Sequence, residues 1–167
     1  ALDRLIAKKR DLKQAAMQQL LTGQTRLPGF SGKWNADALG SVIAALDAGV
    51  SVNSSEGADG PSDEPAILKT SAVVNGRFLP EQCKRIASRD LARARLSPRA
   101  DTILISRMNT PDLVGECGYV ERDWASLFVP DRLWMTRARA DAQLSVRWLA
   151  YVLSSPPLKA RIAASAT

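Results

Sequence analysis

Apolar and polar positions follow a helical pattern at the start of the chain. Residues 1–22 contain neither Pro nor Gly and consist mainly of Ala, Leu, Lys, Arg, Gln and Met, which favour helix. Apolar residues recur there at intervals of three and four, so the predicted helix has one apolar and one basic side. Gly23 is the expected stop, because glycine accepts the left-handed backbone that ends helices. The apolar stripe consists of Leu2, Leu5, Ile6, Leu12, Ala16 and Leu20.

The pattern changes to that of short strands in the middle of the chain. A short helix is first predicted over 37–46, with Asp37 as its N-cap, and a polar surface loop over 53–64. Asn75 and Gly76 indicate a tight turn. Apolar runs bounded by Pro, Gly and Asp predict strands at 66–69, 72–74, 101–107, 114–121, 125–129 and 133–136.

Two helices are predicted at the end of the sequence. The second begins at Ser155 and Pro156, as N-cap and first helical residue. The predicted class is α+β: a long coiled-coil-type helix followed by a globular domain with one mixed sheet. The first of the two helices spans 143–153 and presents one face made of Leu144, Trp148, Tyr151 and Val152. The aromatic residues expected in the core are Trp34, Phe78, Phe128, Trp134 and Trp148.

Composition is that of an ordinary globular protein, with 46% apolar and 24% charged residues. No run approaches the roughly 18 apolar residues of a membrane span, and the charged N-terminus does not resemble a signal peptide. We therefore expect a cytoplasmic protein without membrane contact. Cys83 and Cys117 lie far apart without a CxxC, which indicates neither disulfides nor zinc and predicts inert thiols. Because the sequence opens in mid-helix, we interpret it as a fragment.

The absence of histidine excludes many enzyme classes. Without His the chain cannot supply a Ser-His-Asp or Cys-His relay, a histidine general base or a His-ligated metal. Phosphate-binding and dinucleotide-binding glycine motifs are also absent from the sequence. We therefore predict a binding protein with no catalytic residue, metal or cofactor.

Positive charge is concentrated in two blocks. The net charge is +6, and the pI is about 9.7. Residues 1–40 carry seven cationic and three acidic side chains, residues 41–65 none and five, and residues 66–111 nine and three. Such blocks favour a polyanion as partner, although solvated surface charge is the alternative. The densest cluster is Lys84, Arg85, Arg89, Arg93, Arg95 and Arg99.

Local motifs add a family resemblance. The stretch AKKRDLKQAAMQQLLTGQTRLPGF at 7–30 closely resembles the end of the conserved spacer helix in specificity subunits of type I restriction-modification systems. The rest resembles a target recognition domain of that family. The stretches that carry this second resemblance are ILKTSAV at 67–73 with Asn75 and Gly76, ILISRMNT at 103–110, LVG at 113–115 and LFVPDRLW at 127–134.

The resemblance implies an organisation and a function. Residues 1–23 would be the end of a spacer helix, 24–34 a connector, and 35–167 a target recognition domain that is incomplete at its C-terminus. Such a subunit recognises double-stranded DNA at a split site and directs separate methyltransferase and restriction (nuclease-translocase) subunits there. It needs no catalytic residue of its own. The apolar stripe either packs against a second spacer helix, which we favour, or folds back on its own domain.

Polar residues near predicted strand ends are the candidate DNA contacts. Lys69 and Arg107 can contact guanine and Asn109 adenine, each by paired hydrogen bonds. The hydroxyl residues Thr70, Ser71 and Thr110 can bind bases or phosphates. Their alternative role is structural, as polar residues at turns and strand ends whose hydrogen bonds are made within the fold. The residues expected on phosphates are Arg93 and Arg95.

Two other functions compete with DNA recognition. A protein-interaction module could use the basic blocks to bind an acidic partner. A metal-dependent nuclease is less favoured, because its carboxylates would lack a lysine or histidine partner. The acidic residues available to it are Asp112, Glu116, Glu121 and Asp131.

Overall fold

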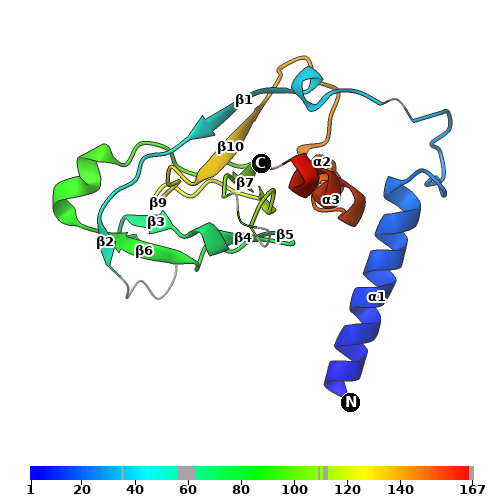
Figure 1. Ribbon diagram of the computed structural model, residues 1–167, viewed down its shortest axis with the longest axis horizontal. Coiled ribbons are helices and arrows are strands. Elements are labelled where there is room, and N and C mark those ends of the chain that lie inside the picture. Colours follow the sequence, from blue (N-terminus) through cyan, green and yellow to red (C-terminus); the bar gives the residue numbers. More distant parts are fainter. Residues whose placement is uncertain (35, 56–62, 109, 111–112, 166–167) are drawn as a thin grey trace. The chain divides into compact units, whose positions relative to one another are not determined.

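The chain consists of an N-terminal helical unit and a sheet-rich domain. The computed structural model describes residues 1–34, 36–55, 63–108, 110 and 113–165 (Figure 1). Contacts divide the chain into two units, Ala1–Asp37 and Ala38–Thr167. A helix of 20 residues precedes a domain of strands and short helices, so the predicted α+β class is confirmed.

The first unit contains α1 (Leu2–Leu21), as the sequence predicts. Thr22 caps its end, and Gly23 follows with a φ of 76°. The indole of Trp34 lies against Gly23, where a Cβ atom would be 2.0 Å from the indole Nε1. The guanidinium of Arg26 lies 4.2 Å from the centre of the same ring. Glycine is therefore required at position 23 by backbone conformation and by close approach.

The second unit contains strands, two α-helices and three short 3-10 helices. The helices are α2 (Val146–Leu153), α3 (Pro156–Ser165), η1 (Leu39–Ser41), η2 (Thr70–Ala72) and η3 (Ser88–Arg93). The strands are β1 (Ile43–Ala48), β2 (Ser54–Ser55), β3 (Ala66–Leu68), β4 (Val73–Val74), β5 (Gly76–Phe78), β6 (Cys83–Ile86), β7 (Thr102–Ser106), β8 (Cys117–Val120), β9 (Leu127–Phe128) and β10 (Leu133–Ala138).

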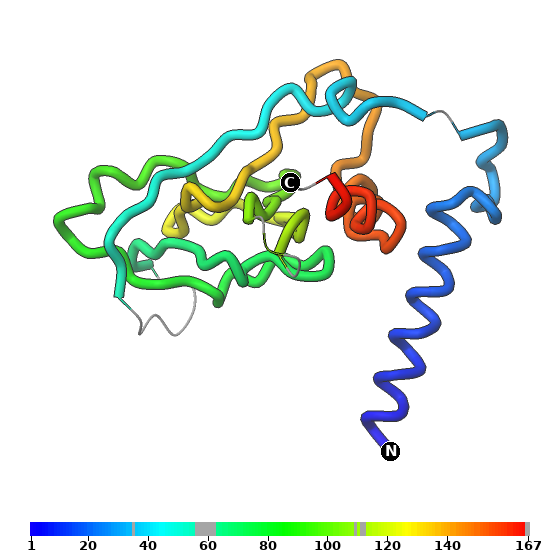
Figure 2. Tube along the Cα trace, in the orientation of Figure 1, coloured from blue at the N-terminus to red at the C-terminus, as the bar shows by residue number. Residues whose placement is uncertain are grey.

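The strands form two mixed sheets where one was expected. The larger sheet has the order β1-β10-β7-β8-β5-β4, and the smaller has the order β2-β6-β3-β9. Neighbouring strands are antiparallel except for the pairs β5/β8 and β3/β9. Figure 2 shows β1 and β10, which are far apart in the sequence, running side by side.

Two apolar cores lie on opposite faces of the larger sheet. Side chains alternate along β7, so Leu104 belongs to the core shared with the smaller sheet and Ile103 to the core shared with α2. Both side chains are fully buried. Helix α2 packs on β7 and β8, and α3 adjoins α2 (Figure 1). The larger sheet is thus the middle layer of the domain.

The prediction of a helix over residues 37–46 is wrong. The chain forms only η1 there, and β1 then pairs with β10 along its length. Burial alternates along β1 from the buried Ile43 onward, as in a strand with one covered face. Ala and Leu favour helix, but pairing with β10 overrides this preference.

Three other expectations need correction. The loop predicted over 53–64 starts with a strand, because β2 pairs with β6, and residues 56–62 lie outside the described residues. The sequence pattern missed β5 and β6.

Helix α2 begins three residues later than predicted, where the Ser145 hydroxyl accepts a hydrogen bond from the Trp148 backbone N–H at 3.2 Å. Its buried residues are Val146, Leu149, Ala150 and Leu153 rather than the predicted face.

The aromatic residues are less buried than the sequence predicts. Trp34 is 45% exposed, so its assignment to the core is wrong. Its ring instead covers the end of α1. Phe78 and Trp148 are half-buried and pack against the two cores. Phe128 and Trp134 are also half-buried.

The predicted turn at Asn75 and Gly76 is confirmed. Both residues have positive φ, 50° and 75°, which is the conformation that joins β4 to β5. The start of α3 at Pro156 is also confirmed. Both predictions depend only on neighbouring residues and not on contacts with distant parts of the chain.

Candidate nucleic-acid interface

The segment after β7 carries the first group of predicted DNA-binding residues. Arg107 is exposed, and its backbone N–H donates to the Arg132 carbonyl oxygen at 3.0 Å. Its guanidinium donates to the Asp131 carbonyl oxygen at 3.3 Å and lies 5.6 Å from the centre of the Trp134 ring. Thr110 is exposed, and its carbonyl oxygen accepts from two backbone N–H groups. Asn109 lies outside the described residues.

The second group lies between β3 and β4. The Lys69 backbone N–H donates to the Gln82 carbonyl oxygen at 2.9 Å. Ser71 is exposed, and its hydroxyl donates to Gln82 Oε1 at 2.9 Å. Thr70 is half-buried. The Ser71 hydroxyl is thus already used in a hydrogen bond within the fold, which agrees with the alternative, structural role of these residues.

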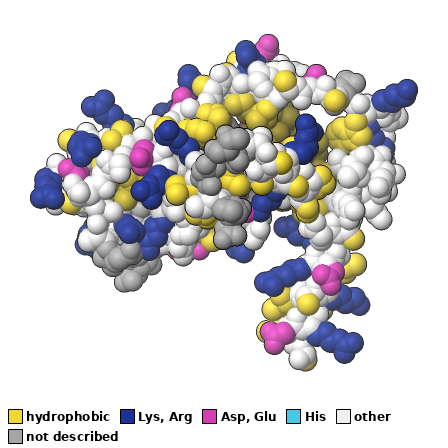
Figure 3. All heavy atoms as spheres, in the orientation of Figure 1, with side chains coloured by type: hydrophobic (Ala, Val, Ile, Leu, Met, Phe, Trp, Pro, Cys, Tyr) yellow, Lys and Arg dark blue, Asp and Glu magenta, His cyan; other side chains and the backbone are white. Residues whose placement is uncertain are grey.

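The third group belongs to the basic segment, which we define as residues 84–99, from β6 through η3. It carries six Lys and Arg against one acidic residue. Figure 3 shows Lys and Arg side chains gathered over the end of the domain that carries β6 and η3. Arg85 pairs with Glu64 at 2.6 Å. The exposed residues Arg89, Arg95 and Arg99 have no acidic side chain of the described residues within ion-pair distance.

The acidic residue of the basic segment, Asp90, is buried. Its Oδ2 accepts hydrogen bonds from the Asn53 backbone N–H at 2.8 Å and the Asn53 side chain at 2.6 Å. The backbone hydrogen bond is the main cause that lowers the pKa of Asp90. Arg93 lies 3.6 Å from Oδ1 and also donates to the Ser51 carbonyl oxygen. Arg93 therefore shares its charge with Asp90, whereas Arg95 has no such ion pair with any described residue.

Each of the three groups is anchored to a different part of the domain. The segment after β7 contacts the start of β10, the segment between β3 and β4 contacts the β5–β6 connection, and η3 contacts the segment before β2. The structure also presents two exposed cations that sequence analysis did not select. Arg122 stacks 4.0 Å from the centre of the Trp124 ring, and Arg132 lies opposite Arg107. The position of Arg132 opposite Arg107 depends on the register between β7 and β10, which the spacing of residues in the sequence does not reveal.

The apolar stripe of α1 is uncovered within its own unit. The helix has no buried residue, and Leu2, Leu5 and Leu12 are more than half exposed, at 69%, 52% and 58%. Ile6 is 39% exposed, and Ala16 is also exposed. Leu20 is half-buried. The unit by itself leaves an apolar surface available to a partner.

The carboxylates of the nuclease alternative have separate structural contacts. Glu121 pairs with Arg147 at 3.1 Å, and Asp131 lies in the turn between β9 and β10. Asp112 lies outside the described residues. Within the described ranges, no three His, Cys, Asp or Glu residues form a group able to hold a metal ion. Over the same residues, no helix has the length and apolarity to cross a membrane.

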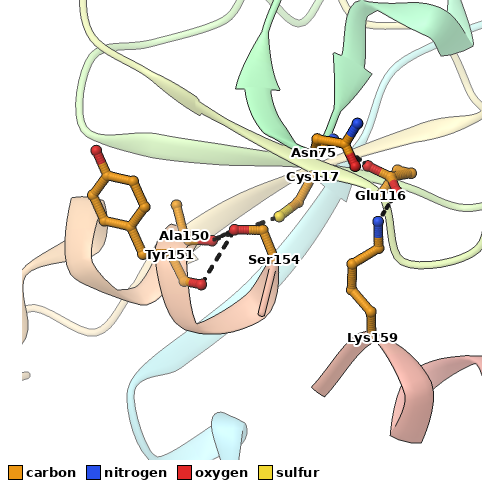
Figure 4. A network of polar contacts seen from close by, with 7 residues as sticks. All are labelled: Asn75, Glu116, Cys117, Ala150, Tyr151, Ser154 and Lys159. Atoms are coloured by element: carbon orange, nitrogen blue, oxygen red, sulfur yellow. Dashed lines mark hydrogen bonds and ion pairs between the residues drawn. The ribbon is translucent and has the colours of Figure 1, made fainter. Parts of the chain in front are cut away.

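Glu116 links three segments at the base of the loop that follows β7. Its buried side chain pairs with Lys159 of α3 and accepts from the Asn75 backbone N–H (Figure 4). Its carbonyl oxygen accepts from the Ser106 backbone N–H at 2.7 Å, which closes the loop carrying Arg107. The contacts of Glu116 thus join α3, the β4–β5 turn and the end of β7.

Both cysteines are expected to resist alkylation in the folded protein. Burial raises the pKa of the Cys83 thiol, and burial with the Glu116 charge raises that of Cys117 to about 12. At pH 8 only about one Cys117 in ten thousand would be thiolate, the reactive form. Mass spectrometry after iodoacetamide treatment should detect labelling only in denaturant. Rapid labelling of either cysteine in the native protein would contradict the buried positions.

Comparison with known proteins identifies a shared fold. No protein-family profile and no curated protein sequence matches the chain. A chain of a solved structure, described as the structural basis of complex assembly and conformational transition of the type I R-M system, matches with a TM-score of 0.52. The match covers 93% of this chain and 38% of that chain, at 20% identity. The chain therefore has a fold similar to part of a protein of a type I restriction-modification structure.

Proposed function

We propose that the chain recognises double-stranded DNA as part of the specificity subunit of a type I restriction-modification complex. In this role it would direct separate methyltransferase and restriction subunits to a split target site. The observation that carries the proposal is the fold shared over 93% of the chain with a chain from a type I R-M structure. The spacer-like sequence at 7–30 supports the same assignment independently of the fold.

The distribution of charge supports DNA as the ligand. The basic segment combines six cationic residues with one acid that is buried and hydrogen-bonded to Asn53. Arg95 and Arg99 are exposed, and no acidic side chain of the described residues pairs with them, so they are available to phosphates. Phosphate contacts dominate the affinity of DNA-binding proteins. Lys69, Thr70, Thr110 and Asn109 remain proposed contacts to bases or phosphates.

The exposed stripe of α1 suggests how the complex would be assembled. Leu2, Leu5 and Leu12 would pack against a second spacer helix in an antiparallel coiled coil, since none of the described residues of the unit 1–37 buries them. A rod of 20 residues at about 1.5 Å per residue is roughly 30 Å long, which suits a spacer between two recognition domains.

Binding of duplex DNA at several salt concentrations tests the proposed function. If four to six phosphates are neutralised, log K should fall against log salt with a slope of about −4 to −5. Affinity should then fall by about 250- to 1,000-fold between about 50 and 200 mM salt. The measurement is fluorescence anisotropy of a labelled mixed-sequence duplex with the full chain.

The same assay separates DNA recognition from the protein-interaction alternative. A slope near zero, or a failure of unlabelled duplex to compete, would remove DNA as the ligand. An acidic protein can compete with the duplex as a polyanion. If it displaces the duplex only at a much higher concentration of negative charge than unlabelled DNA needs, the DNA proposal stands. Cleavage of the duplex on addition of Mg²⁺ would instead favour the nuclease alternative.

A further inference from the structure

Two arginines lie opposite each other beside the paired strands β7 and β10. Arg107 directly follows β7, and Arg132 directly precedes β10. Strand pairing matches Leu133 with Ser106 and Trp134 with Ile105. The hydrogen bond from the Arg107 N–H to the Arg132 carbonyl oxygen continues this register by one residue. Arg107 and Arg132 are therefore cross-strand neighbours. Their side chains leave the same face of the sheet with Cβ atoms about 5 Å apart.

This pairing is unfavourable in the free protein. Like charges directly opposite each other across two strands destabilise a sheet. Both arginines are exposed, and among the described residues no acidic side chain lies within ion-pair distance of either. The neighbouring Asp131 contributes its backbone carbonyl oxygen to Arg107, and that oxygen carries no net charge. Among the residues that the structure describes, no ion pair thus compensates the repulsion.

Trp134 orients one of the two guanidinium groups. Trp134 lies in β10 and Arg132 directly precedes that strand. Because the two residues are two positions apart in an extended chain, their side chains lie on the same face. The Arg107 guanidinium lies 5.6 Å from the centre of its ring. An aromatic ring attracts a guanidinium and restricts its plane without neutralising its charge. The ring contact therefore orients the Arg107 guanidinium without supplying a counter-charge.

We propose that Arg107 and Arg132 form one seat for a phosphodiester group of duplex DNA, with Trp134 orienting Arg107. The inference rests on the proposed function and deepens it by naming the atoms that hold the backbone. Guanidinium groups bind phosphate oxygens through paired, charge-assisted hydrogen bonds. A phosphate would relieve the repulsion between the two cations, whereas a neutral guanine edge would not. The arrangement therefore favours a phosphate contact over the guanine contact first expected of Arg107.

A double-mutant cycle on DNA affinity tests the seat. The variants are Arg107→Ala, Arg132→Ala and their combination in the full chain, with a mixed-sequence duplex as probe. If both arginines hold one phosphate, the double variant should reduce the salt slope by about 0.9, and the two single effects should not add. In the absence of DNA, Arg132→Ala should unfold at no lower temperature than the wild type, because it removes repulsion.

Arg137→Ala is the matched control. It removes the same charge from β10, the strand that Arg132 directly precedes, but Arg137 is already paired with Asp47 at 3.0 Å. Its salt slope should equal that of the wild type. Arg132→Lys should retain the slope, because it keeps the charge that the phosphate requires.

Each outcome has a distinct consequence. A double variant with the wild-type slope would overturn the seat while leaving DNA binding intact. A slope reduced by about 1.8 with additive single effects would also overturn it, because the arginines would then contact separate phosphates. A wild-type chain that shows no salt-dependent DNA binding would contradict the proposed function itself.

Discussion

Replacing Lys159 with Ala is expected to lower the free energy of unfolding by about 3 kcal/mol, because removal of one partner leaves a buried charge uncompensated. The Glu116 side chain is only 7% exposed and that of Lys159 is 29% exposed, so water can replace the lost ammonium only poorly. The ion pair also holds α3 against the segment before β8 (Figure 4). The loss therefore combines an uncompensated carboxylate with weaker docking of a helix.

Urea unfolding of a double-mutant cycle separates these two contributions. Lys159→Met keeps most of the side-chain volume, and Glu116→Gln keeps an oxygen for the Asn75 N–H. The double variant should be more stable than the sum of the single effects predicts, because it contains no unpaired buried charge.

Arg147→Ala provides the comparison for an exposed ion pair. Arg147 and Glu121 are 58% and 70% exposed, so breaking their pair should lower the free energy of unfolding much less than breaking the buried pair does. A loss in Lys159→Ala no larger than that in Arg147→Ala would show that Glu116 is not buried as described.

Replacing Asn109 with Ala is expected to cost about 1 to 3 kcal/mol on the cognate DNA site and little on scrambled DNA. The expectation rests on the sequence, since Asn109 lies outside the described residues. It follows the end of β7 by three positions, in the loop whose base Glu116 closes. An amide side chain can pair with adenine through two hydrogen bonds, and such a contact discriminates among bases.

The comparison variant for Asn109 is Arg95→Ala. Arg95 is exposed, and loss of a phosphate contact there would weaken binding to cognate and scrambled duplexes alike and reduce the salt slope by about one. Both variants should be measured in the complete methyltransferase complex at two salt concentrations. If Asn109→Ala weakens both duplexes equally, Asn109 is not a base reader.

Local sequence signals predicted the parts of the fold that depend on local interactions. The helix α1 has a long periodic pattern and a glycine stop, and the structure confirms it. Strand β7 and the turn at Asn75 and Gly76 were likewise predicted, because a short apolar run and residues that favour positive φ act over a few positions. The start of α3 at Pro156 follows from the same kind of local rule.

Features that depend on distant pairing were not predictable from the sequence. Residues 43–48 consist largely of helix-favouring Ala and Leu, but they form β1 because β10 offers an edge for pairing. The division into two sheets depends on β6 lying between β2 and β3. The candidate site shows the same limit. The basic segment is visible in the sequence, whereas the opposition of Arg107 and Arg132 follows from the register of β7 and β10.

If the proposed function is right, this chain gives a methyltransferase its DNA sequence preference. Methylome sequencing should compare cells that carry the intact system with cells in which this chain is deleted. We expect a split methylated motif that disappears on deletion and returns when the chain is supplied again. Methylated motifs that are the same with and without the chain would show that it does not set the sequence preference.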